Sequence, residues 1–163
     1  RGTAGDGEGR RSTETDEGVN PAVPTVLFLC VANSARSQLA EGLARAMAPP
    51  GYSFLSAGSQ PGTLNRLTVA ALAEIGIDIS RHRAKGIDEV PLAAVETIVT
   101  LCAEEVCPAV PGTVRRIHWP LPDPAGAPGS DAERLVAFRR TRDRLRELLP
   151  ALWSTVPSAT GSP

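Results

Sequence analysis

The chain has few aromatic residues, a single lysine and no long hydrophobic run. Aromatic side chains make up 4% of its 163 residues, and Lys85 is the only lysine among 17 basic residues. No apolar stretch approaches the roughly 18 residues of a membrane span, and no signal peptide is visible, so we expect no membrane partner. The net charge is −1 and no dense basic patch occurs, which argues against nucleic acid as the main partner.

Cysteine is also scarce. Three cysteines without the spacing of a disulfide scaffold suit a reducing cytoplasm better than secretion, so we predict a cytoplasmic protein. An apolar content of 42% suffices for one core. We expect a monomer with one domain over residues 23–153, a disordered tail or linker at residues 1–22 and a flexible tail at residues 154–163. The first residue is Arg rather than Met, which leaves open a longer polypeptide with a fused upstream domain.

Apolar runs alternate with helical periods along the middle of the chain. We predict strands near residues 26–29, 52–57, 96–101 and 115–119. Helices are predicted from residue 37, after the cap Asn65, near residues 88–94, and after the capping box of Ser130 and Glu133. This alternation predicts an α/β fold with a four-stranded parallel sheet, doubly wound, with helices on both faces. Such a sheet has its site outside the carboxyl ends of the strands, where Cys30, Cys102 and Asp123 all fall.

The most informative pattern is CVANSARS, which joins the end of the first predicted strand to the start of a helix. The predicted anion-binding loop comprises Val31, Ala32, Asn33, Ser34, Ala35, Arg36 and Ser37. Its backbone N-H groups and the positive end of the helix can hold a tetrahedral oxyanion, and Arg36 adds a two-pronged donor. Asn33 tolerates the positive φ of a tight loop, and Ser37 is placed to donate a hydrogen bond to the sulfur of Cys30.

The positive field of this loop favours the thiolate of Cys30, so we predict that Cys30 is a nucleophile. The alternative is a buried, inert cysteine beside a surface arginine.

Two further cysteines lie together in TLCAEEVCP. Cys102 and Cys107 fit a redox pair, and the alternatives are two inert core thiols or two ligands of a structural zinc ion. Zinc usually takes four ligands with a two-residue spacing in at least one pair, and the two histidines that could complete the set, His82 and His118, are not local. We therefore expect no metal and no cofactor.

CVANSARS resembles the phosphate-binding loop of the low-molecular-weight protein tyrosine phosphatase superfamily. Together with TLCAEEVCP and HWPLPDPAG, it is similar to the thioredoxin-coupled arsenate reductases of that superfamily, over residues from about Val26 to about Leu149. The loop motif marks the superfamily, and the thiol pair selects the branch. The resemblance implies a low-molecular-weight phosphatase-like fold and an arsenate reductase that serves arsenic detoxification.

The resemblance also implies roles for the site residues. Cys30 attacks arsenate, Cys102 attacks Cys30 to expel arsenite, and Cys107 attacks Cys102 to form a disulfide that thioredoxin or a similar reductant reduces. Phosphate and sulfate are expected to compete with arsenate. Asp123, which precedes a proline, takes the place of the general acid that protonates the leaving oxygen. Without the family context, the alternative for Asp123 is an Asp-Pro turn former.

One segment, SRHRAKG, departs from the family pattern. Members that bind potassium carry oxygen-bearing and acidic side chains after its histidine, and two of those oxygen ligands are missing here. We hypothesise that the ammonium of Lys85 replaces the cation, pairs with Glu41 and holds Asn33 in place. The alternative is a solvated surface lysine.

The two histidines are expected to be supporting residues rather than catalysts. His82 is predicted to hydrogen-bond to Ser37 or Asn33, and His118 to pack beside Trp119.

Two other functions remain open beside arsenate reduction. A phosphatase would share Cys30 and Arg36, but no aromatic residue follows Asp123 and Pro124 to receive a phosphotyrosine ring. A non-catalytic oxyanion or redox-sensing module is the third alternative. The electron donor is open too, because a low-molecular-weight thiol with a glutaredoxin-like partner could replace thioredoxin.

Overall fold

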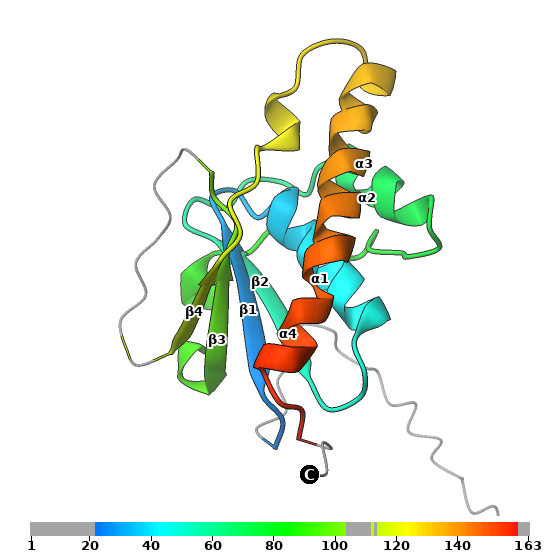
Figure 1. The fold of residues 1–163 in the computed structure, drawn as a ribbon. Coiled ribbons are helices and arrows are strands. Elements are labelled where there is room, and N and C mark those ends of the chain that lie inside the picture. The colour runs from blue at the N-terminus through cyan, green and yellow to red at the C-terminus, as the bar shows by residue number, and fades with distance from the viewer. Residues whose placement is uncertain (1–21, 104–111, 113, 160–163) are drawn as a thin grey trace, which may run out of the picture.

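The computed structural model describes residues 22–103, 112 and 114–159, and its centre is a parallel four-stranded sheet (Figure 1). The strands are β1 (Thr25–Cys30), β2 (Ser53–Gly58), β3 (Val95–Thr100) and β4 (Arg115–His118). They lie in the order β2-β1-β3-β4. The predicted α/β class and the four predicted strands are confirmed.

The central strand β1 is buried at every position, which fits its unbroken run of apolar residues between Thr25 and Cys30. It pairs with β2 on one side and with β3 on the other, so that Leu29 lies opposite Ala57 and Thr100. The carboxyl ends of these three strands therefore meet at one edge of the sheet.

The described α-helices gather on one face of the sheet (Figure 1). They are α1 (Arg36–Met47), α2 (Arg66–Ala73), α3 (Asp131–Leu148) and α4 (Pro150–Thr155). The predicted caps are present, because Asn65 accepts a hydrogen bond from the Leu67 amide and Ser130 accepts one from the Glu133 amide. Phe138 of α3 is fully buried in the core that these helices share with β1.

The other face of the sheet is covered differently. A second core that contains Leu27 and Leu29 packs against a segment with two 3-10 turns, η1 (Ile87–Glu89) and η2 (Leu92–Ala94), where the sequence predicted a short helix. The connection from β2 to β3 passes β1 and returns on this opposite face, as a right-handed crossover requires. The sheet is thus doubly wound as predicted, although the described α-helices cover only one of its faces.

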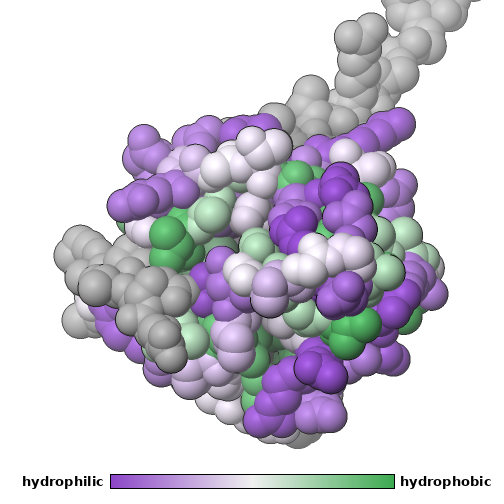
Figure 2. Space-filling model, turned by 90° about the horizontal axis from the view of Figure 1, so that it is seen from above, coloured by the Kyte–Doolittle hydropathy of each residue, from purple (hydrophilic) through white to green (hydrophobic). Residues whose placement is uncertain are grey.

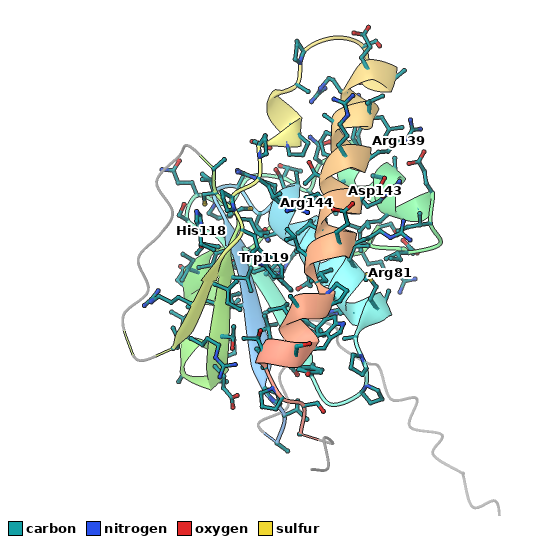
Figure 3. The ribbon with its side chains drawn as sticks, viewed as in Figure 1. Arg81, His118, Trp119, Arg139, Asp143 and Arg144 are labelled. Carbon is teal, nitrogen blue, oxygen red and sulfur yellow. The ribbon has the colours of Figure 1, made fainter. Side chains whose placement is uncertain are left out.

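Charged side chains link the helices on the outer surface. Arg139 and Arg142 of α3 both bind the carboxylate of Glu74 at the end of α2, at 2.6 Å and 2.9 Å. Figure 3 shows Arg139, Asp143 and Arg144 along this helix. These contacts fix α2 against α3.

At the end of β4, His118 and Trp119 have different partners (Figure 3). His118 Nδ1 lies 2.7 Å from the hydroxyl of Thr100, whereas Trp119 packs against the helix-covered core. Successive residues of extended chain face opposite sides, so His118 takes a hydrogen-bonding partner on β3 instead of packing beside Trp119 as expected.

The chain remains packed beyond the predicted domain boundary at residue 153. Helix α4 continues to Thr155, and Val156 is buried and accepts a hydrogen bond from the hydroxyl of Tyr52. Among the described helices, none is long and apolar enough to cross a membrane.

Candidate active site

Cys30 lies at the end of β1, where the chain curls into the loop that leads to α1. Its thiol is free and its side chain is only 2% exposed. The Ser37 hydroxyl lies 2.8 Å from the sulfur, and the Asn33 amide donates to the sulfur at 3.2 Å. Asn33 has a φ of 52°, the positive value that the sequence predicted for this loop.

The side chain of Asn33 sets the direction of the hydrogen bonds around the sulfur. Its Nδ2 donates to the Ser37 hydroxyl at 2.7 Å, so the hydrogen of that hydroxyl is left to point at Cys30. Its Oδ1 accepts from Gln38 Nε2 at 3.0 Å and from the Lys85 amide at 2.8 Å. Two donors are thus aimed at the sulfur.

A second segment holds the loop from outside. We call residues 58–68 the collar, because its members donate to successive loop carbonyls. Backbone amides of Ser59, Gln60, Gly62 and Asn65 bind the carbonyls of Cys30, Val31, Ala32 and Ser34, and the Thr68 hydroxyl also binds Ser34.

The C=O and N-H of a trans peptide unit point in opposite directions. Bonds that draw the loop carbonyls outward therefore turn the following amides inward. Asn33 shows this, because the Ala32 carbonyl binds the collar while the Asn33 amide faces Cys30. The loop is built as a cradle of inward amides at the start of α1, which suits a tetrahedral oxyanion.

Arg36 joins the loop to two other segments at the same sheet edge. It is buried, and its Nη1 donates to the carbonyls of Leu101 at 3.4 Å and Leu121 at 3.0 Å. Its Nη2 lies 4.0 Å from the carboxylate of Asp123. The arginine therefore contacts the residue before Cys102 and the loop that carries Asp123.

Asp123 sits in an open position. Its side chain is 46% exposed, and its carboxylate caps the short turn Pro124–Gly126 by accepting from the Ala125 amide at 3.0 Å. Both the expected turn and the expected proximity to the anion loop are therefore present.

Cys102 follows β3, the strand next to β1. It is 1% exposed and disulfide-bonded. The Leu101 amide donates to the Leu29 carbonyl at 2.9 Å, so the pairing of β1 with β3 continues to the residue before Cys102. Cys107 lies outside the described residues.

The supporting residues are present with different partners from those expected. His82 Nδ1 lies 3.0 Å from Gln38 Oε1 and 3.1 Å from Glu41 Oε2, and it reaches Asn33 only through Gln38. The expectation of a direct bond to Ser37 or Asn33 was wrong because Gln38, one turn into α1, stands between them. Gln38 is a buried site residue that sequence reasoning missed, since an amide on a helix carries no signal of its own.

Glu41 and Lys85 do not form a direct ion pair in the described part of the chain. The ion-pair partners of Glu41 are His82 and Arg45, and the ammonium of Lys85 donates to the Arg83 carbonyl at 3.5 Å. The predicted Lys85–Glu41 pair is therefore corrected, because His82 already occupies the carboxylate. Lys85 holds Asn33 through its backbone amide instead.

The two charges still act on each other at longer range. Burial raises the pKa of Glu41, but the hydrogen bond with His82 and the charges of Arg45 and Lys85 outweigh it, and the pKa is lowered. Burial lowers the pKa of Lys85, and the charge of Glu41 counters this only in part.

The described residues contain no group of three or more His, Cys, Asp or Glu side chains that could hold a metal ion. Viewed onto the carboxyl edge of the sheet, the surface is mostly hydrophilic, with small separate hydrophobic areas (Figure 2). Such an edge suits a small, charged substrate better than a large apolar one.

Sequence comparison identifies the family. Residues 25–160 match the model of the low molecular weight phosphotyrosine protein phosphatases. The chain belongs to this family. It is 43% identical over 122 residues to an arsenate reductase of Halalkalibacterium halodurans, a match that covers 74% of this chain and 88% of that protein.

Structural comparison also finds arsenate reductases. An arsenate reductase in its phosphate-binding state matches with a TM-score of 0.71 and 28% identity, over 82% of this chain and 99% of the other. A thioredoxin-dependent arsenate reductase of Corynebacterium glutamicum matches with a TM-score of 0.61 and 31% identity, over 86% of this chain and 68% of the other. The low-molecular-weight phosphatase-like fold is thereby confirmed.

Proposed function

We propose that this protein is an arsenate reductase that captures arsenate on Cys30 and reduces it through an intramolecular disulfide relay. One observation carries the proposal: a free thiol in an anion cradle lies at the end of β1, and a second cysteine follows the neighbouring strand β3. The similarity to arsenate reductases over most of the chain supports it.

Strand register places Cys30 and Cys102 at the same edge of the sheet. Leu29 pairs with Thr100, so Cys30 is one residue and Cys102 two residues beyond a paired position. Neighbouring strands lie about 4.8 Å apart and rise about 3.3 Å per residue, which gives a Cα separation of about 6 Å if the pairing continues, within the range of about 4.4 to 6.8 Å that a disulfide spans. Because successive residues of a strand face opposite sides, the two thiols would then face opposite sides of the sheet, so the proposal requires the chain after Leu101 to turn out of the strand direction when Cys102 attacks.

The atoms and electrons of the relay balance without a cofactor. The Cys30 thiolate attacks arsenate and water leaves, after Asp123 donates a proton to the departing oxygen. The Cys102 thiolate then attacks the Cys30 sulfur, and the electron pair of the broken sulfur–arsenic bond stays on arsenic, which leaves as arsenite. Cys107 attacks Cys102, frees Cys30 and forms the last disulfide, and two electrons from an external dithiol reopen it.

Among the described cysteines, Cys30 is free and Cys102 is disulfide-bonded. Cys107 takes the third position in the proposal on the resemblance alone. The donor is proposed to be thioredoxin, because one structural relative is a thioredoxin-dependent arsenate reductase.

The same proposal includes a monomer in the cytoplasm, with arsenate as substrate and phosphate or sulfate as competitors. It also includes one catalytic domain over residues 23–153, to which the packed residues up to Val156 are added. A phosphomonoesterase is the second candidate, because the family is named for phosphatase activity and the anion cradle would serve either reaction. Ala125, which follows Asp123 and Pro124, offers no ring to stack on a phosphotyrosine.

The test is mass spectrometry after one turnover of fully reduced protein with arsenate. Wild type is expected to contain a Cys102–Cys107 disulfide, and Cys107→Ser a trapped Cys30–Cys102 disulfide, with one arsenite released in each case. Cys102→Ser is the matched control and should release no arsenite.

Arsenite release from Cys102→Ser at the wild-type rate would contradict the relay. Multi-turnover hydrolysis of an aryl phosphate without reductant, faster than arsenate reduction, would favour the phosphatase instead.

A further inference from the structure

Gly58, the last residue of β2, lies between two parts of the site. On one side it is paired with Cys30 in the register of β1 and β2. On the other it forms a parallel bridge with Gly86, and its amide donates to the Lys85 carbonyl at 2.9 Å. Lys85 in turn donates its own amide to Asn33, so Gly58 joins the strand of the nucleophile to the segment that supports the loop.

The space beside Gly58 is filled by the backbone of the anion loop. A Cβ atom at this position would lie 2.3 Å from the Val31 carbonyl oxygen, 2.8 Å from the Asn33 nitrogen and 3.0 Å from the Ala32 carbonyl carbon. Backbone atoms cannot rotate away as the end of a side chain can. The Asn33 nitrogen is also the donor that faces the Cys30 sulfur at 3.2 Å.

Position 58 requires glycine because there is no space for a side chain, and not because of its backbone conformation. The described glycines with positive φ are Gly51, Gly76, Gly112 and Gly129. Gly58 is not among them, so an alanine could adopt its backbone angles without strain. A methyl group at position 58 would therefore perturb the loop through contact alone.

We propose that Gly58 is a positioning residue for the anion site: the absence of its side chain lets the loop close, so that the collar can hold its carbonyls and the Asn33 amide can face Cys30. The inference rests on the proposed function, because it takes this loop as the oxyanion site. An ordinary contact with the Val31 oxygen would require a displacement of about 1 Å, and a misplacement of this size costs about 100-fold in rate.

The experiment compares Gly58→Ala with Gly62→Ala. Gly62 is the matched control, because it belongs to the same collar and donates to Ala32 at 2.9 Å, but an added Cβ would meet Ala32 only at ordinary distances of 3.8 and 4.0 Å.

Three quantities are measured: the dissociation constant for inorganic phosphate by calorimetry, kcat/KM for arsenate, and the free energy of unfolding without anion. Gly58→Ala is expected to weaken phosphate binding at least about tenfold and to lower kcat/KM about 100-fold. Gly62→Ala keeps the amide that binds the Ala32 carbonyl and adds no close contact, so it should lose much less than Gly58→Ala in both quantities.

A second variant guards against poor folding of Gly58→Ala. Thr68→Val is nearly isosteric and removes only the hydroxyl that donates to the Ser34 carbonyl at 2.7 Å. Loss of one such bond corresponds to about threefold to tenfold weaker phosphate binding if the collar sets the loop. Wild-type phosphate affinity in Thr68→Val would count against the inference.

The outcomes separate this inference from the reductase proposal. If Gly58→Ala loses phosphate affinity while wild type fails to reduce arsenate, the inference stands and the reductase proposal falls. If Gly58→Ala binds phosphate as wild type does, the inference is overturned whatever the reductase assay gives. A lower free energy of unfolding with an unchanged phosphate dissociation constant would likewise overturn it, because the role of Gly58 would then be purely structural.

Discussion

The anion loop, residues 30–37, and the acid loop, residues 120–126, lie at the same edge of the sheet but are held in different ways. In the anion loop, Cys30, Asn33 and Ser37 are almost fully buried, and the collar binds the loop from outside. In the acid loop, Asp123 is 46% exposed and bonds mainly to its own turn. The proposed anion-binding end of the site is therefore preorganised, whereas the end that carries the proposed proton donor is open to water.

This difference matches the role proposed for each loop. A cradle lowers the cost of binding when its donors are fixed before the anion arrives. A proton donor must be recharged from solvent after each turnover, which an exposed carboxyl allows. Arg36, a residue of the anion loop, contacts the acid loop through the Leu121 carbonyl and lies 4.0 Å from the carboxylate of Asp123, and so links the two loops.

Asp123→Asn tests the acid loop and is expected to have the largest effect. An amide cannot donate a carboxyl proton, so kcat for arsenate should fall about 100-fold or more, while phosphate binding changes little. Asp131→Asn is the control, because Asp131 is also exposed and its ion pairs with Arg66 and Arg134 involve no residue of the anion loop. Steady-state kinetics and phosphate calorimetry measure the two effects. An equal loss of phosphate affinity in Asp123→Asn would show that the carboxylate acts by holding Arg36.

Ser37→Ala tests the anion loop from within. It removes the hydroxyl that faces the Cys30 sulfur at 2.8 Å. If Cys30 attacks as a thiolate, as proposed, the loss of a hydrogen bond to that charged group corresponds to about tenfold to 100-fold in kcat/KM. Ser59→Ala is the control, since Ser59 serves the collar through its backbone amide. Unchanged kcat/KM in Ser37→Ala, measured from pH 5 to 9, would remove Ser37 from the set of residues that support the thiolate.

Glu41→Gln tests the support beneath the anion loop. The pKa of Glu41 is lowered on folding, so its contribution to stability is complete above the unfolded value of about 4.3 and is lost as pH falls through the lower folded value. The variant should be less stable by about 1 to 3 kcal/mol at pH 7, and this difference should shrink at pH 3.5. Urea unfolding at both pH values measures it. Glu147→Gln, an exposed pair with Arg144, should show little difference at either pH, and a gap for Glu41→Gln that stays constant with pH would contradict the assignment.

Lys85→Met gives the smallest expected effect. The lysine holds Asn33 by its backbone amide, so loss of the ammonium should lower kcat/KM by only about twofold to fivefold, the size of a partly screened charge interaction. Rates of wild type are expected to be the same in potassium and choline buffers if Lys85 takes the place of a cation. Arg83→Ala, whose guanidinium pairs with Glu89, is the control. A large increase in the wild-type rate with potassium would contradict the hypothesis that Lys85 replaces a bound cation.

Much of the anion loop could be predicted from neighbouring residues. The apolar run of β1 is buried along its length, Asn33 has the positive φ expected of it, and Ser37 lies against Cys30. Each of these features depends on chain within a few residues, where backbone preferences act directly. The contacts of His82 and Lys85 were predicted incorrectly, because they depend on which side chains of α1 face the segment after Ile79.

The sequence alone determined the order of strands and helices along the chain, the anion loop and the thiols. These features follow from local hydrophobic periodicity and from residue types that have few other uses. Only the tertiary structure decided that Gly58 lies against the loop, that Gln38 links Asn33 to His82, and that Arg36 binds carbonyls 65 and 85 residues away. Such contacts are set by which strands become neighbours in the sheet. A glycine, an amide side chain or a backbone carbonyl acquires its role only from what the fold places beside it.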